Sequence, residues 1–337
     1  MNHTEELANA YILASESLVN HRAVFMPSEE DCEPAPFHYR WSDLLLNGTR
    51  HIAIEGYRES AKTQYVIRGH TLYRLQYPSK DYDYIIFIKA NQTIADSMLK
   101  EIANRYISDP GMSANLVKVN KNVDGIFDVI VKDMQGQEIN VRIEAYGKGS
   151  SAIRGLVWGD IRPKLCLIDD CQTLEDSQSE TVLKKDWDWF LSDVVFLGKS
   201  TRIFMIGNNL GELCIIEQVI KNADDLDFDV ERVPVVDEFN NPTWPARNTI
   251  EEIEAEKESF RKLGKLDIWL REKKCQAIDP ETQQFKKEYF KYVDVEPKGL
   301  SKFTLVDPAI SKEDKACFTA IITWGVNPDN HWFLVDV

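Results

Sequence analysis

The chain has 337 residues, of which 43% are hydrophobic, and it carries a formal net charge of −15. This size and composition are typical of a globular protein with one or two domains, and the acidic charge argues against a general nucleic-acid coat, although it leaves room for a local basic DNA-binding surface. No stretch reaches the roughly 18 apolar residues of a membrane span, no secretory signal opens the chain, and the six scattered cysteines suit a reducing cytosol better than disulfides or structural zinc.

Patterns typical of strands and helices alternate along the first two thirds of the chain. Helical spacing of apolar residues predicts helices over these segments: 37–48, 61–76, 93–108, 179–195 and 212–222. Short continuous apolar runs predict buried strands over these: 51–56, 84–90, 164–170 and 201–209. Residues 127–147 alternate around a Gln-Gly-Gln turn and predict a hairpin. Together they predict an α/β fold with a largely parallel sheet and helices on both faces.

The pattern changes after residue 245. Residues 245–275 are charged and mostly helical, and three consecutive strand candidates begin at residue 303. We interpret them as the opening of a second domain.

The segment from Gly56 to Thr63 has the phosphate-binding loop pattern G-x-x-x-x-G-K-[ST], with Ala61 in place of the second glycine. It follows a predicted strand and opens a predicted helix, so that backbone N–H groups and the helix N-terminus can surround phosphate oxygens. We expect Lys62 to neutralise the β- and γ-phosphates of ATP and Thr63 to offer its hydroxyl to Mg²⁺. Alanine disfavours positive φ, and we expect residue 61 to sit at the helix start, where alanine is comfortable. The candidate ATP-binding residues are Gly56, Tyr57, Arg58, Glu59, Ser60, Ala61, Lys62 and Thr63. The same letters also fit an ordinary strand-to-helix connection with a solvated lysine.

Two acids, Asp169 and Asp170, end the apolar strand predicted over residues 164–170. Ligands of open α/β sheets bind at the carboxyl ends of strands. One carboxylate can hold the Mg²⁺ shell, and the other can orient and deprotonate a water that attacks the γ-phosphate. We therefore expect these acids and the loop before Lys62 to meet at one Mg·ATP.

A later strand ends in Gly207, Asn208 and Asn209, where an asparagine can touch the γ-phosphate or the attacking water and report its loss. An asparagine-rich turn is the plainer interpretation of this segment alone. Arg154 and Arg162 lie before the paired acids, next to a glycine- and serine-rich stretch, and either can reach the phosphate of a neighbouring subunit.

Taken in order, these motifs resemble the large terminase subunit of tailed bacteriophages, and the resemblance covers nearly the whole chain. The most specific stretch is 153–173, which is similar to the family's RG…RP…hydrophobic–DD block. The other similar segments are 35–45 (adenine side), 57–63 (arginine-containing phosphate loop), 206–209 (coupling motif), 242–257 (a Trp-Pro segment leading to a helix) and 303–325 (start of an RNase H-like nuclease).

The resemblance implies a DNA-packaging motor. A P-loop ATPase domain of the ASCE type would drive double-stranded DNA through a portal protein into an empty procapsid, a small terminase subunit would select the DNA, and a C-terminal nuclease would cut the concatemer. The working form would be a homo-oligomeric ring, generally of five subunits. It would act in the host cytoplasm and transiently at the procapsid portal, with no membrane involved.

Carried over by position, the resemblance implies roles for individual residues. Arg58 and Lys62 would contact phosphates, and Thr63 and Asp169 would hold Mg²⁺. The family commonly has a glutamate after the aspartate.

In this chain Asp170 stands where the family commonly has that glutamate, and its side chain is shorter. The resemblance implies that Asp170 activates the water, and Glu175, the next glutamate along the chain, is the alternative base.

The resemblance also divides the chain into a P-loop ATPase domain (1–245), a helical linker or subdomain (246–300) and the first part of an RNase H-like nuclease (301–337). Asp307 matches the first acid of that nuclease's divalent metal pair. The remaining acids are expected beyond Val337, which implies that the nuclease is incomplete here.

Other functions fit parts of the same pattern. A helicase-like or recombinase-like ATPase would use the same core, and a nucleotide-binding assembly protein could plug a portal without turnover. A small-molecule kinase would need an acceptor pocket and a lid, and the sequence gives no sign of either.

Overall fold

Eight strands form one sheet in the order β3-β4-β5-β2-β6-β7-β1-β8 in the computed structural model, which describes residues 3–27, 32–276, 291–308 and 319–336. The strands are β1 (His51–Gly56), β2 (Tyr84–Lys89), β3 (Leu116–Val123), β4 (Ile126–Lys132), β5 (Glu138–Gly147), β6 (Leu165–Asp169), β7 (Arg202–Gly207) and β8 (Phe228–Val233). The six strands from β5 to β8 in this order run parallel, and β4 and β3 extend the sheet antiparallel. The predicted α/β class with a largely parallel sheet is confirmed.

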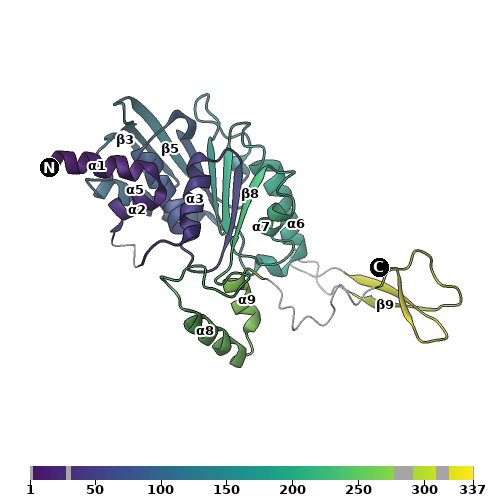
Figure 1. Cartoon of the computed structure of the whole chain (residues 1–337). Helices are drawn as coiled ribbons and strands as arrows, with labels where there is room; N and C mark the ends of the chain where they lie inside the picture. The colour runs from purple at the N-terminus through teal and green to yellow at the C-terminus, as the bar shows by residue number, and fades with distance from the viewer. Residues whose placement is uncertain (1–2, 28–31, 277–290, 309–318, 337) are drawn as a thin grey trace.

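Helices cover both faces of this sheet (Figure 1). On one face lie α1 (His3–Glu16), α2 (Leu18–Phe25), α3 (Pro36–Asn47), the π-helical segment η2 (Thr63–Gly69) with its continuation α4 (His70–Gln76), and α5 (Gln92–Ser108). On the other lie α6 (Glu180–Trp189), its π-helical continuation η6 (Phe190–Val194) and α7 (Ile215–Lys221). Because both faces are covered, the central strands are apolar without interruption.

Alternation along each strand divides the core into two layers. In β1, Ile52 and Ile54 pack into the layer of α3 and η2, and Ala53 packs into the layer of α6 and α7. In β6, Leu167 packs into the layer of α3 and η2, and Cys166 packs into the layer of α6 and α7. This is the two-residue period of a strand, and it fixes which side chains at the strand ends point toward which helices.

The parts of the fold that the sequence did not predict lie mainly at its borders. Polar residues interrupt the apolar ones in both edge strands, with two lysines and two asparagines in β3 and three charged residues in β8, and β3 is largely exposed, so neither has the apolar run of a central strand. Helices α1 and α2 were also not predicted. The helix predicted over 61–76 begins with the wider π-helical turns of η2.

Two further helices, α8 (Ile250–Lys262) and α9 (Leu266–Lys274), follow the sheet and lie near the carboxyl ends of its parallel strands (Figure 1). Trp269 and Leu270 of α9 are buried in the same core layer as α3. Among the described residues, no helix has both the length and the apolar character needed to cross a membrane.

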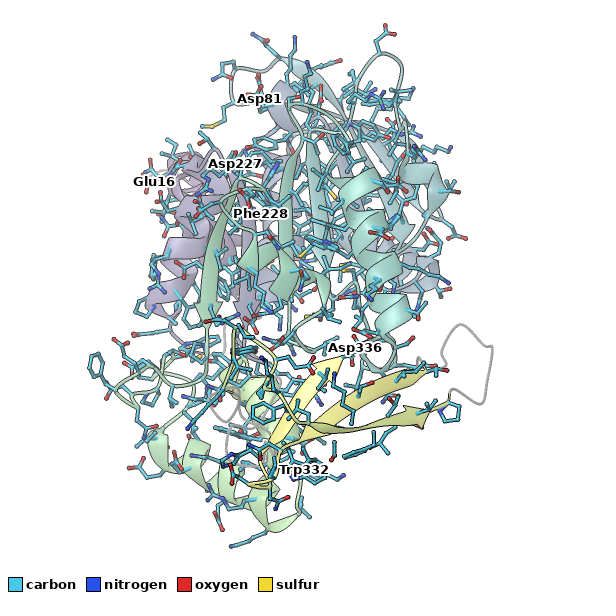
Figure 2. All side chains as sticks on the ribbon, turned by 90° about the vertical axis from the view of Figure 1, so that its right-hand side faces the viewer. Glu16, Asp81, Asp227, Phe228, Trp332 and Asp336 are labelled. Carbon is cyan, nitrogen blue, oxygen red and sulfur yellow. The ribbon has the colours of Figure 1, made fainter. Side chains whose placement is uncertain are left out.

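A separate antiparallel sheet has the order β11-β10-β9, formed by β9 (Ser301–Asp307), β10 (Ala320–Val326) and β11 (Trp332–Asp336). In Figure 2, Asp81 and Asp227, which precede β2 and β8, mark the amino edge of the large sheet, and Trp332 and Asp336 of β11 lie toward its other end. Apolar side chains of the small sheet such as Leu305 are exposed. Asp314, another acid of this region, lies outside the described residues.

Candidate active site

The loop after β1 folds back tightly over the end of its own strand. A Cβ added to Gly56 would lie 2.7 Å from the Ser60 hydroxyl and 3.4 Å from Cδ of Lys62. A side chain at position 56 would therefore force the Ser60 hydroxyl out of its place in the loop. Lys62 lies largely buried beneath the loop, with 7% of its surface exposed.

Ala61 has a φ of 60°, and Glu59 a φ of 79°. The expectation that alanine takes helical dihedral angles at position 61 is therefore wrong. Lys62, with φ −53° and ψ −47°, is the first residue in the helical region. Residue 61 keeps the left-handed conformation that glycine usually supplies, and alanine adopts it at a conformational cost.

Helix α3 supports this loop through His38. The Ala35 N–H donates to Nδ1 of His38 over 2.9 Å, so the proton of the neutral ring is on Nε2, which donates to the Ser60 carbonyl over 2.9 Å. The ring also stacks on Tyr65 of η2, with centroids 4.2 Å apart. Burial lowers the pKa of His38 to about 4, so the imidazole stays neutral near pH 7.

The loop and the paired acids come together at the carboxyl edge of the sheet. The Thr63 hydroxyl donates to Oδ1 of Asp169 over 3.2 Å, although 106 residues separate the two. Strand β7 lies between β1 and β6, so the end of the loop reaches across it to the end of β6. Asp169 is buried, with 1% of its surface exposed. Burial and the neighbouring Asp170 raise the pKa of the Asp169 carboxyl, and the charges of Lys89 and Lys62 oppose this rise.

Lys89, at the end of β2, completes this cluster. Its Nζ lies 2.7 Å from Oδ2 of Asp169, and its side chain is 12% exposed. The sequence analysis missed this residue. The available signal was a lysine at the end of an otherwise apolar strand, but its partner depends on β2 lying next to β6.

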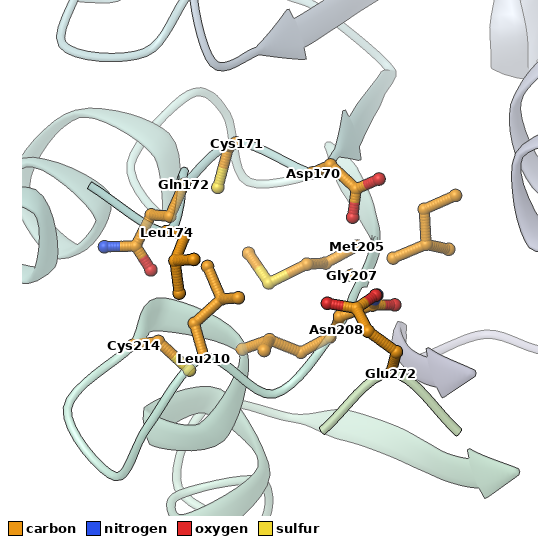
Figure 3. Close-up of a pocket in the computed structure, with 12 residues that line it drawn as sticks. Asp170, Cys171, Gln172, Leu174, Met205, Gly207, Asn208, Leu210, Cys214 and Glu272 are labelled. Atoms are coloured by element: carbon orange, nitrogen blue, oxygen red, sulfur yellow. The ribbon is translucent and has the colours of Figure 1, made fainter. Parts of the chain in front are cut away.

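Asp170 lies beside Asp169 but faces a different space. Its φ is 42°, its N–H donates to the carbonyl of Ile206 over 3.2 Å, and it lines a cavity of about 250 Å³ (Figure 3). Asn208 and Glu272 line the same cavity, whereas Glu175 is exposed and is not part of its lining. The structure thus places Asp170, and not Glu175, beside the carboxyl end of β7.

The three candidate coupling residues, Gly207, Asn208 and Asn209, lie at the carboxyl end of β7. Gly207 ends β7, and the Asn208 amide donates to the Glu272 carboxylate over 2.8 Å. The Asn209 amide donates to Glu217 over 3.0 Å. Oδ1 of Asn208 is a buried acceptor with no hydrogen-bond partner in the described part of the chain. Such an atom can accept a hydrogen bond from a bound water or ligand.

Helix α9 holds the tip of the loop. The backbone N–H of Arg58 donates to the carbonyl of Glu272 over 2.7 Å, and Nζ of Lys273 lies 2.7 Å from the Glu59 carboxylate. The Arg58 side chain is 72% exposed, and its guanidinium lies 3.9 Å from the Glu272 carboxylate. The sequence analysis did not assign Glu272 or Lys273 to the site, since they lie more than 200 residues from the loop.

The remaining candidates lie away from this cluster. Arg154 is exposed after the short helix η4 (Ser151–Ile153). Arg162 lies three residues before β6, which places it at the amino edge of the sheet, opposite to the phosphate loop. Asp307 ends β9 in the small sheet, is exposed, and pairs with Ala320.

The described residues contain no group of three or more His, Cys, Asp or Glu side chains that could hold a metal ion by themselves. The Thr63 hydroxyl and the Asp169 carboxylate are nevertheless two adjacent oxygen donors. Mg²⁺ in nucleotide sites needs only one or two protein oxygens, because phosphate oxygens and waters supply the others. The site therefore fits Mg²⁺ that arrives with a nucleotide better than Mg²⁺ bound by protein alone.

The sequence matches no known protein-family profile and no curated protein. Solved structures are similar. The large terminase of bacteriophage HK97 shares 13% sequence identity with a TM-score of 0.54, over 94% of this chain and 66% of that one. The large terminase of a thermophilic bacteriophage, in complex with ADP, shares 10% identity with a TM-score of 0.44, over 87% of this chain and 66% of that one.

The chain spans 66% of the length of the HK97 protein. At 13% identity the likeness concerns the fold, and it agrees with the eight-stranded, mostly parallel sheet and its helices on both faces. The chain has the fold of the bacteriophage large terminases.

Proposed function

We propose that this chain is the ATP-hydrolysing motor subunit that translocates double-stranded viral DNA into a procapsid. The observation that carries the proposal is the 3.2 Å contact between Thr63 and Asp169. It joins a phosphate-loop threonine to a strand-end acid across an intervening strand, which is the arrangement that ATP hydrolysis needs. The fold likeness to the HK97 large terminase favours DNA packaging over other ATP-driven functions.

The nucleotide would lie over the loop between Gly56 and Thr63. Lys62 would place its ammonium at the β- and γ-phosphates, and the exposed side chain of Arg58 can turn toward them. Thr63 and Asp169 would hold Mg²⁺, which when bound would neutralise charge on the β- and γ-phosphate oxygens.

Asp170 is our candidate for the general base. It lines the cavity beside Asn208, and a water held there can donate one proton to the Asp170 carboxylate and another to the unpaired Oδ1 of Asn208. Gly207 and Asn209 would then move when the γ-phosphate is lost and transmit this change to the loop that precedes α7. Glu175 is the alternative base, on a turn that would have to move to reach the cavity.

In the working ring of five subunits that the resemblance implies, a neighbouring subunit would contribute an arginine to the site. Arg154 and Arg162 are the candidates in this chain. Both are exposed, as a residue that reaches into another subunit must be.

The domain division follows the same proposal. Residues 1–245 would form the ATPase domain, 246–300 a helical linker or subdomain, and 301–337 would belong to an RNase H-like nuclease domain. Asp307 would be the first ligand of its divalent metal pair, which needs several carboxylates about two ions. The partners would be double-stranded DNA, the portal protein and a small terminase subunit, met in the host cytoplasm and at the procapsid portal.

The decisive experiment is ATP hydrolysis with and without double-stranded DNA. We expect DNA-stimulated turnover in the unmodified protein and a loss of at least 100-fold in Lys62→Ala and in Asp169→Asn, with unchanged circular dichroism. Normal hydrolysis in Lys62→Ala would refute the site. An absence of turnover in the unmodified protein would favour a non-hydrolysing assembly role, and unwinding of a forked duplex would favour a helicase.

A further inference from the structure

Lys89 and Asp169 form a buried ion pair across two adjacent parallel strands. Ile88 of β2 is in register with Ile168 of β6, so the next residues of the two strands end side by side. Phe87 and Leu167 both pack in the layer of α3 and η2, so Lys89 and Asp169, two residues further on, point toward that same layer. Their charged atoms are 2.7 Å apart, and their side chains are 12% and 1% exposed.

Both oxygens of the Asp169 carboxylate are engaged by the protein. Oδ1 accepts from the Thr63 hydroxyl, and Oδ2 accepts from Lys89. Lys62 adds a second positive charge that acts on the same carboxylate. Each oxygen keeps a second lone pair, but a divalent cation that binds Asp169 must lie close to the ammonium group of Lys89, against repulsion that is strong where water is excluded.

This arrangement assigns Lys89 a function that neither the sequence motifs nor the fold likeness supplies. We propose that Lys89 keeps divalent cations from Asp169 until a nucleotide is bound: its ammonium serves as the counter-ion of Asp169, and the charge of a triphosphate is needed to bring a metal ion beside it. The inference rests on the proposed function, since it takes Asp169 as the metal-holding acid. It makes Lys89 a positioning residue that orders the binding of nucleotide and metal.

A purely structural role for Lys89 predicts something different. A buried ion pair that only stabilises the fold would lower the stability of the protein when broken, because an uncompensated buried carboxylate remains. It would not change how tightly nucleotide-free protein binds a divalent cation. Cation affinity and stability therefore separate the two roles.

The test measures Mn²⁺ binding to the nucleotide-free protein, from the loss of the free Mn²⁺ signal in electron paramagnetic resonance. We expect Lys89→Gln, which keeps a hydrogen-bond donor and removes the charge, to bind Mn²⁺ at least about tenfold more tightly than the unmodified protein. Lys89→Arg, which keeps the charge, should bind as the unmodified protein does. With ATP present, the difference between Lys89→Gln and the unmodified protein should shrink.

Asp169→Asn combined with Lys89→Gln is the matched control, because it lacks the charge of Lys89 and also lacks the carboxylate that the lysine neutralises. It should abolish the gain in Mn²⁺ affinity. Equal Mn²⁺ affinity in Lys89→Gln and the unmodified protein would overturn the proposal.

Stability gives a second readout if Lys89→Gln folds poorly. If Mn²⁺ can take the place of the lysine charge, added Mn²⁺ must raise the melting temperature of Lys89→Gln more than that of the unmodified protein. If no Mn²⁺ concentration stabilises Lys89→Gln, the result counts against the proposal. The result is separable from the proposed function: normal hydrolysis in Lys62→Ala would refute the assigned ATP site, whereas tighter Mn²⁺ binding in Lys89→Gln would still show that Lys89 keeps a divalent cation from Asp169.

Discussion

The Thr63 hydroxyl donates a hydrogen bond to the Asp169 carboxylate across the end of β7, so the two candidate Mg²⁺ ligands are already in contact. Thr63→Val removes the hydroxyl and keeps the shape of the side chain. We expect ATP affinity measured with Mg²⁺ to fall about tenfold, and affinity measured in excess EDTA to stay the same.

A fluorescent ATP analogue titrated with and without Mg²⁺ measures both quantities. Thr71→Val is the matched control, since the Thr71 hydroxyl donates to the Ile67 carbonyl one turn earlier in the continuous helix of η2 and α4. An equal loss of affinity in Mg²⁺ and in EDTA would show that Thr63 acts on the fold of the loop and not on the metal.

Ala61→Gly should stabilise the protein. Alanine at a φ of 60° destabilises the folded protein by roughly 1–2 kcal/mol, and glycine removes this strain. The greater conformational freedom of glycine also stabilises the unfolded chain by about 0.4–1 kcal/mol, which offsets part of the gain. We expect a net gain in the free energy of unfolding of about 0.5–1 kcal/mol in urea denaturation. Ala255→Gly, at an exposed position inside α8, should instead lose about 1 kcal/mol. A loss in both variants would mean that Ala61 is not strained.

Asp170→Asn should abolish turnover more completely than Glu175→Gln. Asp170 lines the cavity beside Asn208, and removing a general base lowers kcat by about 10²–10⁴-fold. Glu175→Gln should stay within a few-fold of the unmodified protein. Single-turnover hydrolysis under saturating ATP is the measurement, and the reverse ranking would transfer the role of base to Glu175.

His38 should make stability depend on pH in acid solution. The unfolded histidine takes up a proton near pH 6.5 and the folded one only near pH 4, so the unfolded state binds more protons between these values. The contribution of the neutral ring to the free energy of unfolding is therefore fully present above pH 6.5. It is lost as the pH falls toward 4, and the loss is roughly 3 kcal/mol in total.

His38→Gln is the informative variant, because an amide can donate to Ser60 and accept from Ala35 but does not titrate in this range. Its free energy of unfolding, measured in urea from pH 7 to pH 4, should fall less steeply than that of the unmodified protein. Burial also lowers the pKa of His21 and His70, and their contributions remain in both proteins. Identical slopes would show that the His38 ring does not stay neutral.

Local sequence patterns determined much of the central architecture. The apolar runs at β1, β2, β6 and β7 are visible in the chain because strands covered on both faces need no polar residues. Edge strand β3 escaped notice because lysines and asparagines interrupt its apolar residues.

The sequence also marked most of the candidate site. Small residues before Lys62 and twin acids after an apolar strand are local features, so each can be recognised without knowing what lies opposite. The prediction that they meet needed only the rule that parallel strands present their carboxyl ends at one edge.

Only the tertiary structure decided which side chains complete the site. The pairing of Lys89 with Asp169 depends on β2 lying next to β6, and the contact of Glu272 with Arg58 and Asn208 depends on where α9 packs. The left-handed conformation of Ala61 is likewise imposed by the loop as a whole, against the residue's own preference. Strand order and long-range packing arise from contacts across tens to hundreds of residues, and no local spacing encodes them.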